Sequence, residues 1–374
     1  MKIANQISRV IIGVVFIFSG FVKAIDPLGS VYKFNDYFNA FGIPWMEFSS
    51  LPLAVIMSGF EFLVGFSVLF GLRYKLSTLG SLLFMAFFTP LTLYIALYSP
   101  VSDCGCFGDA LILSNTSTFI KNLFILAAAI IIFSYRKKFK TPISPRLQWL
   151  LVAVGATFIV AISVYCYRHE PLIDFRPWKV GNKIKDYVTP VPEVADISLI
   201  YRNKKTGEEK EYAVNNYPWN DSVWVANWEF VDQKKKVIQE YKKAPISDFV
   251  IHDADGNDLT EGYISNPDYN FMLFAYDLME TNRNSFKEIN IFAESAEKDG
   301  YTFIGLTASP FTYIEEFRHE LQTLYPFYLV DEIALKTAIR SNPGIILLRD
   351  GKVIAKWSHR DLPSYQEVKA GYMK

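Results

Sequence analysis

Cysteine is scarce in this chain, with three residues in 374 and none after Cys166. The second half therefore has no thiol for disulfide formation or thiol exchange. Acidic residues are scarce in the first half, where the first 168 residues contain six of the chain's 38. The formal net charge of +0 averages two unlike parts and so says nothing about partners. A phosphate-binding glycine loop, a Ser/His/Asp pattern and a basic stripe are also missing, so no nucleic-acid partner is expected.

Long apolar runs fill the acid-poor half. They are 10–24, 48–70, 76–99, 117–134 and 147–166. Most approach or exceed the roughly 18–20 residues that cross a bilayer as a helix. The first resembles the start of a signal peptide, but no small-residue cleavage site closes it and four more runs follow. We therefore predict five membrane helices in a lipid bilayer.

Basic residues mark one end of these predicted helices. They precede the first helix, separate the second from the third and crowd the connection between the fourth and the fifth. They are Lys2, Arg9, Arg73, Lys75, Arg136, Lys137, Lys138, Lys140 and Arg146. The positive-inside rule then predicts a cytoplasmic N-terminus and an exit on the outer face near Tyr167. In a bacterial inner membrane that face is the periplasm, where disulfides persist.

Two cysteines lie one residue apart in the run Ser102-Asp103-Cys104-Gly105-Cys106-Phe107-Gly108-Asp109, between the third and fourth predicted helices. A disulfide between Cys104 and Cys106 would close a very small ring, far from relaxed geometry, and would be easily reduced. Redox chemistry, a pair of free thiols and half of a metal site are the alternatives. Cys104, Cys106 and His169 would suit zinc or copper, but the usual second pair is missing and no metal site is expected.

The charges beside this pair predict how it reacts. Asp103 and Asp109 are expected to raise the thiol pKa by like-charge repulsion, which leaves ring strain as the source of reactivity. The pair would then oxidise partner thiols. Cys166, at the outer end of the fifth helix, is either a third, resolving thiol or a buried small apolar side chain, and we favour the second reading.

Glu61 is an acidic residue inside the second predicted helix. An ionisable side chain in a membrane is costly and is a candidate functional group by default. Its alternatives are a proton acceptor and a purely structural tie to a neighbouring helix. The aromatic stretch at 84–88 is read as ordinary lipid-facing or core packing in preference to a quinone pocket.

The second half predicts β-strands and then an α/β domain. A hairpin is expected around Lys205-Thr206-Gly207. Strands at 271–276, 301–306 and 327–330 alternate with helices at 284–298, 312–323 and 332–341, before two strands turned at 349–352. This order predicts a sheet with parallel strands and helices packed on it. The expected parts are 1–140 (four-helix membrane domain), 141–169 (fifth membrane helix), 170–243 (β-rich connector) and 244–374 (α/β domain).

The first part resembles the DoxX-like membrane proteins in its opening helix, residues 9–23, and in Glu61 within a glycine-flanked apolar helix. The cysteine loop, followed by Phe119-Ile120-Lys121-Asn122, resembles the MauE branch of that superfamily. The resemblance covers roughly residues 5–135. It implies a four-helix membrane bundle and thiol–disulfide chemistry in envelope protein maturation, linked to the quinone pool.

The last part resembles the membrane-tethered, TlpA-type branch of thioredoxin-like proteins. The match includes the turn at Asp255-Gly256-Asn257 and Pro343, where that family carries a cis-proline. The family places a Cys-x-x-Cys pair after the strand at 271–276, whereas this chain has Asp277-Leu278-Met279-Glu280-Thr281-Asn282. Any redox chemistry must therefore belong to Cys104 and Cys106.

Two classes of function follow from these features. The first is a membrane thiol–disulfide oxidoreductase with Cys104, Cys106 and Glu61 as catalytic residues, periplasmic protein thiols as partners and quinone as the acceptor. The second is a non-enzymatic assembly or interaction factor whose cysteine pair is a structural disulfide. The redox state of the pair in trapped membranes distinguishes them.

Overall fold

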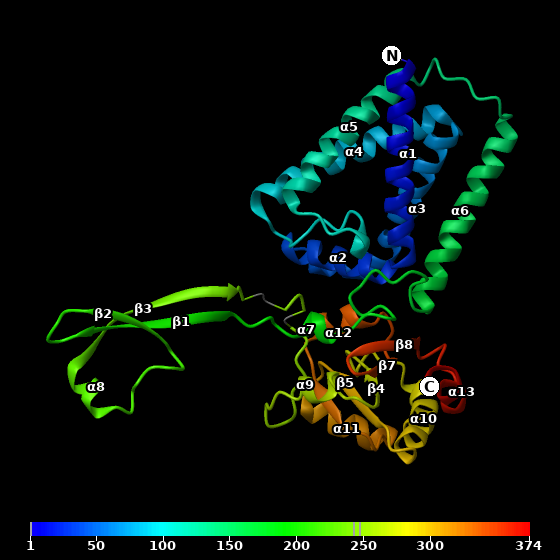
Figure 1. The fold of residues 1–374 in the computed structure, drawn as a ribbon. Coiled ribbons are helices and arrows are strands. Elements are labelled where there is room, and N and C mark those ends of the chain that lie inside the picture. The colour runs from blue at the N-terminus through cyan, green and yellow to red at the C-terminus, as the bar shows by residue number, and fades with distance from the viewer. Residues whose placement is uncertain (1, 242–243, 247) are drawn as a thin grey trace.

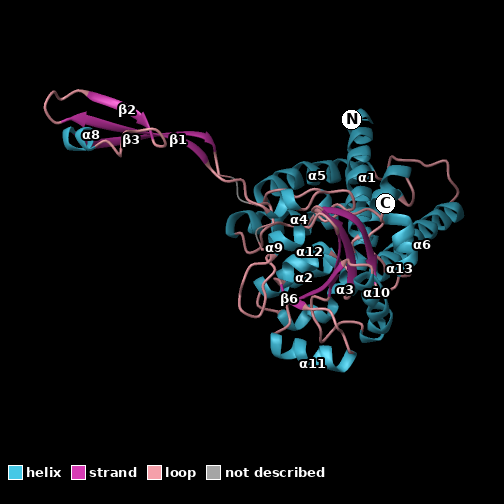
Figure 2. Ribbon diagram, turned by 60° about the horizontal axis from the view of Figure 1, so that its bottom comes forward, coloured by secondary structure: helices cyan, strands magenta, loops and turns pink. Residues whose placement is uncertain are grey.

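The computed structural model describes residues 2–241, 244–246 and 248–374. Three parts are visible in Figure 1: a helical bundle, a β-sheet arm that extends sideways, and an α/β domain below the bundle. The N-terminus and the connection from α5 to α6 lie at the end of the bundle farthest from the α/β domain. Figure 2 shows the arm standing clear of the body from a second direction.

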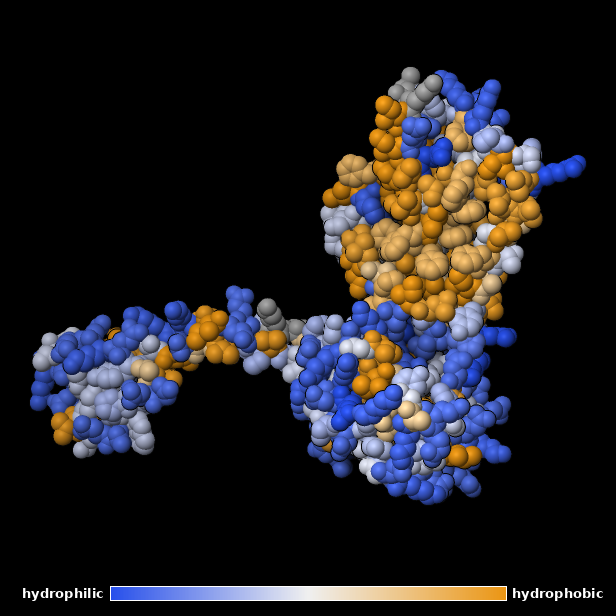
Figure 3. Space-filling model, turned by 45° about the vertical axis from the view of Figure 1, so that its right-hand side comes forward, coloured by the Kyte–Doolittle hydropathy of each residue, from blue (hydrophilic) through white to orange (hydrophobic). Residues whose placement is uncertain are grey.

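The bundle consists of long apolar helices. They are α1 (Lys2–Ile25), α3 (Ser50–Phe70), α4 (Tyr74–Tyr98), α5 (Asn115–Tyr135) and α6 (Pro145–Arg168). Within the described residues, five spans are long and apolar enough to cross a membrane, as predicted. On the face shown in Figure 3, the surface of these helices is mostly apolar and stands above a mostly hydrophilic domain. The chain is a multi-pass membrane protein.

Close packing of α1 against α3 forms the centre of the bundle. At Gly20, an added Cβ would lie 2.6 Å from the Ser58 carbonyl oxygen, so only glycine lets the two backbones approach this closely. The apolar side chains of α1, α3, α4 and α5 interdigitate in one buried cluster, which includes Ile12, Phe16, Val68 and Ile132. Helix α6 lies outside these four and packs through Ile159 onto Phe62.

A further helix, α2 (Pro27–Ala40), was missed in the sequence and lies across the end of the bundle nearest the α/β domain. The side chain of Asp26 caps it by accepting a hydrogen bond from the Gly29 amide at 3.0 Å, and Pro27 occupies its first turn. The acidic cap followed by proline was a usable signal. The short helices η1 (Pro44–Ser49) and η2 (Gly108–Ala110) complete this end.

The arm is an antiparallel sheet of three strands in the order β2-β1-β3. Its elements are β1 (Val194–Asn203), β2 (Glu209–Ala213), α8 (Ser222–Asn227) and β3 (Trp228–Gln239). The predicted hairpin is confirmed, because β1 and β2 pair on either side of Gly207. At the tip, Tyr201 packs edge-on against Trp224.

The α/β domain contains a five-stranded sheet in the order β6-β5-β4-β7-β8. Strands β4 (Tyr269–Phe274), β5 (Thr302–Thr307) and β6 (Phe327–Leu329) are parallel to one another. Strand β7 (Gly344–Arg349) pairs antiparallel with β4, and β8 (Lys352–Ser358) pairs antiparallel with β7. One face of the sheet is covered by α10 (Phe286–Lys298), α11 (Phe311–Leu321) and α13 (Tyr365–Tyr372), and the other by α12 (Glu332–Ala338). The remaining short elements are α7 (Lys185–Val188), α9 (Thr260–Ile264) and η3 (Arg283–Ser285).

This order is the thioredoxin-like arrangement that the sequence predicted. The Asn342–Pro343 peptide bond is cis, also as predicted. The side-chain amide of Asn342 donates to the Asp277 carbonyl oxygen at 2.8 Å, which joins this loop to the segment without cysteines after β4. Arg340, in the cis-proline loop, hydrogen bonds to Asp26 after α1, so this loop faces the membrane bundle.

The tight contact at Gly20 generates a stability prediction. Gly20→Ala should lower the stability of the detergent-solubilised protein by about 1–3 kcal/mol, because the methyl group overpacks the α1–α3 contact. Gly59→Ala is the matched control, since its Cβ would meet Ile159 at an ordinary 3.9 Å. Thermal unfolding, monitored by size-exclusion chromatography, gives the midpoint temperature of each variant. Equal midpoints for the two variants would contradict the packing argument.

Candidate functional site

The cysteine loop connects α4 to α5 at the end of the bundle that faces the α/β domain. Gly105 (φ +67°) and Gly108 (φ +51°) have left-handed backbone conformations, which glycine adopts without strain. The carboxylate of Asp103 accepts a hydrogen bond from the Gly105 amide at 2.8 Å. From α2, the Tyr37 hydroxyl donates to the Cys104 carbonyl oxygen at 3.0 Å. The loop is therefore folded back onto the bundle.

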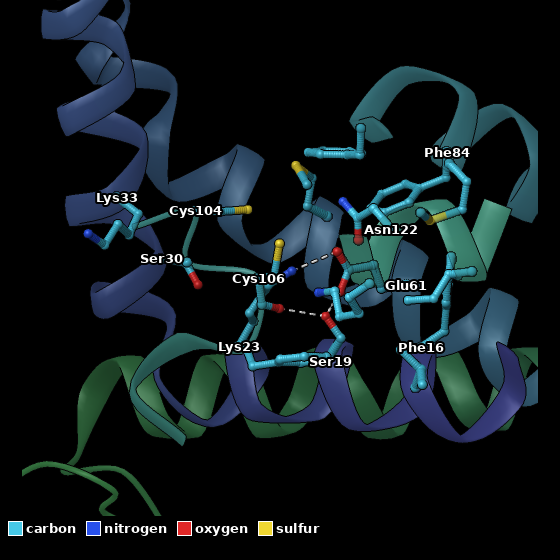
Figure 4. Close-up of a pocket in the computed structure, with 18 of the residues that line it drawn as sticks. Phe16, Ser19, Lys23, Ser30, Lys33, Glu61, Phe84, Cys104, Cys106 and Asn122 are labelled. Carbon is cyan, nitrogen blue, oxygen red and sulfur yellow. Dashed lines mark hydrogen bonds and ion pairs between the residues drawn. The ribbon is translucent and has the colours of Figure 1, made fainter. Parts of the chain in front are cut away.

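Both thiols of this loop face a cavity of about 90 Å³ that reaches into the bundle (Figure 4). Its apolar walls are largely aromatic, and its polar lining comes from α1, α2, α3 and α5. The charged and thiol-bearing side chains that line it are Lys23, Lys33, Glu61, Cys104, Cys106 and Lys121. The structure thus brings all three predicted site residues, Cys104, Cys106 and Glu61, to one cavity.

Glu61 lies at the inner end of a chain of short contacts. Its side chain is 3% exposed and forms an ion pair with Lys23 at 2.6 Å. Its other oxygen lies 2.6 Å from the Ser19 hydroxyl, which is 2.7 Å from the Cys106 carbonyl oxygen (Figure 4). The Ser19 hydroxyl has one proton, so it donates to only one of these two acceptor oxygens at a time.

The two thiols differ in their affinity for a proton. They hydrogen bond to each other, which lowers the pKa of Cys106 to about 7 and raises that of Cys104. Burial opposes the shift at Cys106, and the positive charges of Lys121 and Lys23 support it. The thiolate is the nucleophile in exchange. The lowered pKa makes Cys106 the more readily ionised thiol of the pair.

The predicted effect of the flanking aspartates is wrong for Cys106. The carboxylate of Asp103 is paired with Lys33 at 2.8 Å, and that of Asp109 with Arg340 at 2.9 Å. Each negative charge is offset by a cation from a distant part of the chain, so like-charge repulsion does not control the pair. The pKa of Cys104 is raised, but the hydrogen bond with Cys106 and burial cause that shift.

Lys121 is the cation of the cavity without a carboxylate partner among the described residues. Its ammonium group lies over the Phe107 ring, 4.2 Å from the centroid. With Lys23 paired to Glu61 and Lys33 to Asp103, the charge of Lys121 remains to be balanced. A thiolate at Cys106 would balance it.

Cys166 is 1% exposed on α6 and is not part of the cavity lining. The favoured reading, a buried apolar side chain, agrees with this burial. Sequence reasoning missed Ser19, Lys23 and Tyr37 as site residues. Ser19 and Lys23 are four residues apart and so share one face of α1, a polar stripe in an apolar helix that could have been read.

Comparison with known proteins supports the membrane part most directly. Residues 1–135 match the family described as methylamine utilisation protein MauE. The N-terminal 135 residues form a MauE-type membrane domain. The arm, at residues 195–240, matches a domain of unknown function (DUF8463). No curated protein matches the chain.

Two solved structures are similar to the part of the chain that follows the MauE-type domain and the arm. One is a thiol:disulfide interchange protein from Bacteroides sp., with 17% identity and a TM-score of 0.27, covering 34% of this chain and 86% of that protein. The other, from Bacteroides thetaiotaomicron, is named after protein disulfide isomerases, with 16% identity and a TM-score of 0.26, covering 34% and 85%. At these scores the thioredoxin-like assignment depends on the strand order described above.

The charge balance of the cavity predicts the ionisation of Cys106. In detergent, alkylation of Cys106 by iodoacetamide should follow a midpoint near pH 7, whereas Cys104 should react only at higher pH. Lys121→Gln should move the Cys106 midpoint up toward the ordinary value of about 8.5, because losing a positive charge destabilises the thiolate.

Mass spectrometry of alkylated peptides at graded pH measures both thiols. Lys137→Gln is the matched control, since this exposed lysine lies at the opposite end of the bundle. If Lys121→Gln leaves the Cys106 midpoint unchanged, Lys121 does not stabilise the Cys106 thiolate.

Proposed function

We propose that the chain is a thiol–disulfide oxidoreductase of the bacterial inner membrane in which Cys104 and Cys106 exchange with periplasmic protein thiols. The observation that carries this proposal is a thiol of lowered pKa, Cys106, beside a second thiol at a cavity that reaches a buried acid. The exchange balances as follows: two partner thiols become one disulfide, and the Cys104–Cys106 disulfide becomes two thiols.

The site favours the oxidising direction. A low pKa stabilises the reduced form of a dithiol, and a stabilised reduced form makes the corresponding disulfide a stronger oxidant. The expectation of an oxidant is therefore kept, but its reason becomes stabilisation of the Cys106 thiolate by Cys104 and Lys121 in place of ring strain in the disulfide.

Reoxidation of the pair requires an acceptor for two electrons and two protons. We propose a membrane quinone, which would supply this two-electron chemistry. The aromatic side chains of Phe16, Phe84 and Phe88 line the apolar part of the cavity, while Lys121 and Asn122 line its polar part. Such a site suits a flat ring with carbonyl oxygens. Glu61, through Ser19, is positioned to hold or release a proton near Cys106.

The proposed orientation has the cysteine loop in the periplasm. The loop and the α/β domain lie at the same end of the bundle, and the basic connection from α5 to α6 lies at the other (Figure 1). The positive-inside rule puts that connection in the cytoplasm.

The first test of the function is cysteine substitution. Cys104→Ser and Cys106→Ser should each abolish oxidation of periplasmic protein thiols, while membrane insertion stays intact. Cys166→Ser is the control and should retain activity, because this thiol lies outside the cavity lining. In the parent protein, acid trapping and alkylation should show the pair becoming reduced when quinone is depleted. A pair that stays oxidised throughout, with normal maturation in both variants, would favour the assembly-factor alternative.

The second test separates a proton-handling role of Glu61 from a structural one. Glu61→Gln leaves Lys23 unpaired in a buried site and should cost about 3–5 kcal/mol of stability. The double variant Lys23→Gln with Glu61→Gln removes both charges and should recover most of that stability. If Glu61 handles the proton, turnover should remain low in the double variant. If the double variant recovers both turnover and stability, the role of Glu61 is structural only.

A further inference from the structure

Arg340 of the α/β domain contacts the cysteine loop through its charged side chain. It lies between α12 and the cis-proline, and its side chain is 5% exposed. Its guanidinium donates to both carboxylate oxygens of Asp26, at 2.8 to 3.1 Å, and to Asp109 at 2.9 Å. Asp26 follows α1, and Asp109 lies three residues after Cys106. One side chain thus joins the first membrane helix to the cysteine loop.

The same residue also contacts the chain that leaves the last membrane helix. The backbone amide of Arg340 donates to Glu170 at 3.0 Å, and Glu170 in turn pairs with Arg176. Arg340 is therefore in contact with three segments that emerge from the bundle, after α1, between α4 and α5, and after α6. Buried guanidinium–carboxylate pairs of this kind fix geometry as well as charge.

The bundle leaves space for this contact. At Gly29, an added Cβ would lie 2.6 Å from an Asp26 carboxylate oxygen and 3.1 Å from a guanidinium nitrogen of Arg340. The face of the α/β domain around Arg340 also contacts α2, where the guanidinium lies over the Tyr32 ring at 5.3 Å. The interface is built around the arginine.

We propose that the α/β domain, which has no thiol of its own, acts as a positioning element for the cysteine loop, with Arg340 as the positioning residue. This inference rests on the proposed function in the sense that the positioned thiol is the reacting one. Arg340 contacts the loop through Asp109, and this contact places Cys106 beside Lys121 and Lys23.

The loop needs two anchors to hold this placement. On one side of the thiols, Lys33 of α2 pairs with Asp103 and Tyr37 holds the Cys104 carbonyl. On the other side, Arg340 holds Asp109. The intervening Gly105 and Gly108 give the loop backbone freedom, so losing one anchor releases Cys106 from the lysines that favour its thiolate.

The experiment measures Cys106 alkylation against pH in the full-length, detergent-solubilised protein. Arg340→Gln should slow alkylation of Cys106 at pH 7 by about threefold to tenfold, through an upward shift of its midpoint. Asp109→Asn should produce a shift in the same direction with Arg340 present, and the double variant should shift no further, because the two changes remove one contact. Arg340→Lys should recover part of the effect.

The matched control is Arg283→Gln, which removes an exposed arginine–carboxylate pair with Glu320 elsewhere in the same domain. It should leave Cys106 alkylation unchanged. If Arg340→Gln does not yield folded protein, Asp109→Asn tests the same contact at a more exposed residue.

Two outcomes would overturn the proposal. One is an unchanged Cys106 midpoint in Arg340→Gln and Asp109→Asn. The other is faster alkylation of both thiols, which would make the α/β domain a cover over the loop. The alkylation measurement needs no turnover, so its result is independent of the activity assays. If Arg340→Gln shifts the Cys106 midpoint while the cysteine variants keep full activity, the positioning role stands and the oxidoreductase function is rejected.

Discussion

The ion pair between Glu61 and Lys23 is the interaction on which the rest of the site depends. A carboxylate that is 3% exposed in a membrane bundle requires a partner, and Lys23 supplies it at 2.6 Å. The pair joins α1 to α3 where the Gly20 backbone approach makes this short distance accessible. Through Ser19, the same cluster reaches the Cys106 carbonyl. Helix packing, burial of charge and the position of the thiol are therefore coupled at one point.

Charge neutralisation by distant residues determines the chemistry of the cysteine loop. Asp103 and Asp109 are adjacent to the thiols in sequence, but Lys33 and Arg340 offset them in space. What remains is the hydrogen bond from Cys104 and the charge of Lys121, which has no carboxylate partner among the residues that the structure describes; together they favour a thiolate at Cys106. At Cys106, the direction of the pKa shift is therefore opposite to the one that the local sequence predicts.

The sequence predicted those features that depend on local patterns. Apolar length predicted the five membrane helices, and short continuous apolar runs predicted the strands around Phe271 and Ile345. Two missed contacts share a physical cause. Asp26 caps α2 but also pairs with Arg340, 314 positions away, and Lys23 pairs with Glu61 across 38 positions. Such contacts depend on which helix faces are juxtaposed, and hydropathy alone does not specify that.

The arrangement also explains how a thioredoxin-like domain can be retained without thiols. In the resembled family the segment after β4 would carry the redox pair, and here that segment, 277–282, lies beside the cis-proline loop at the edge facing the bundle. Arg340 extends from the same edge to the loop that does contain two thiols. The domain therefore faces the loop that contains the two thiols, and the sulfur atoms belong to the membrane part.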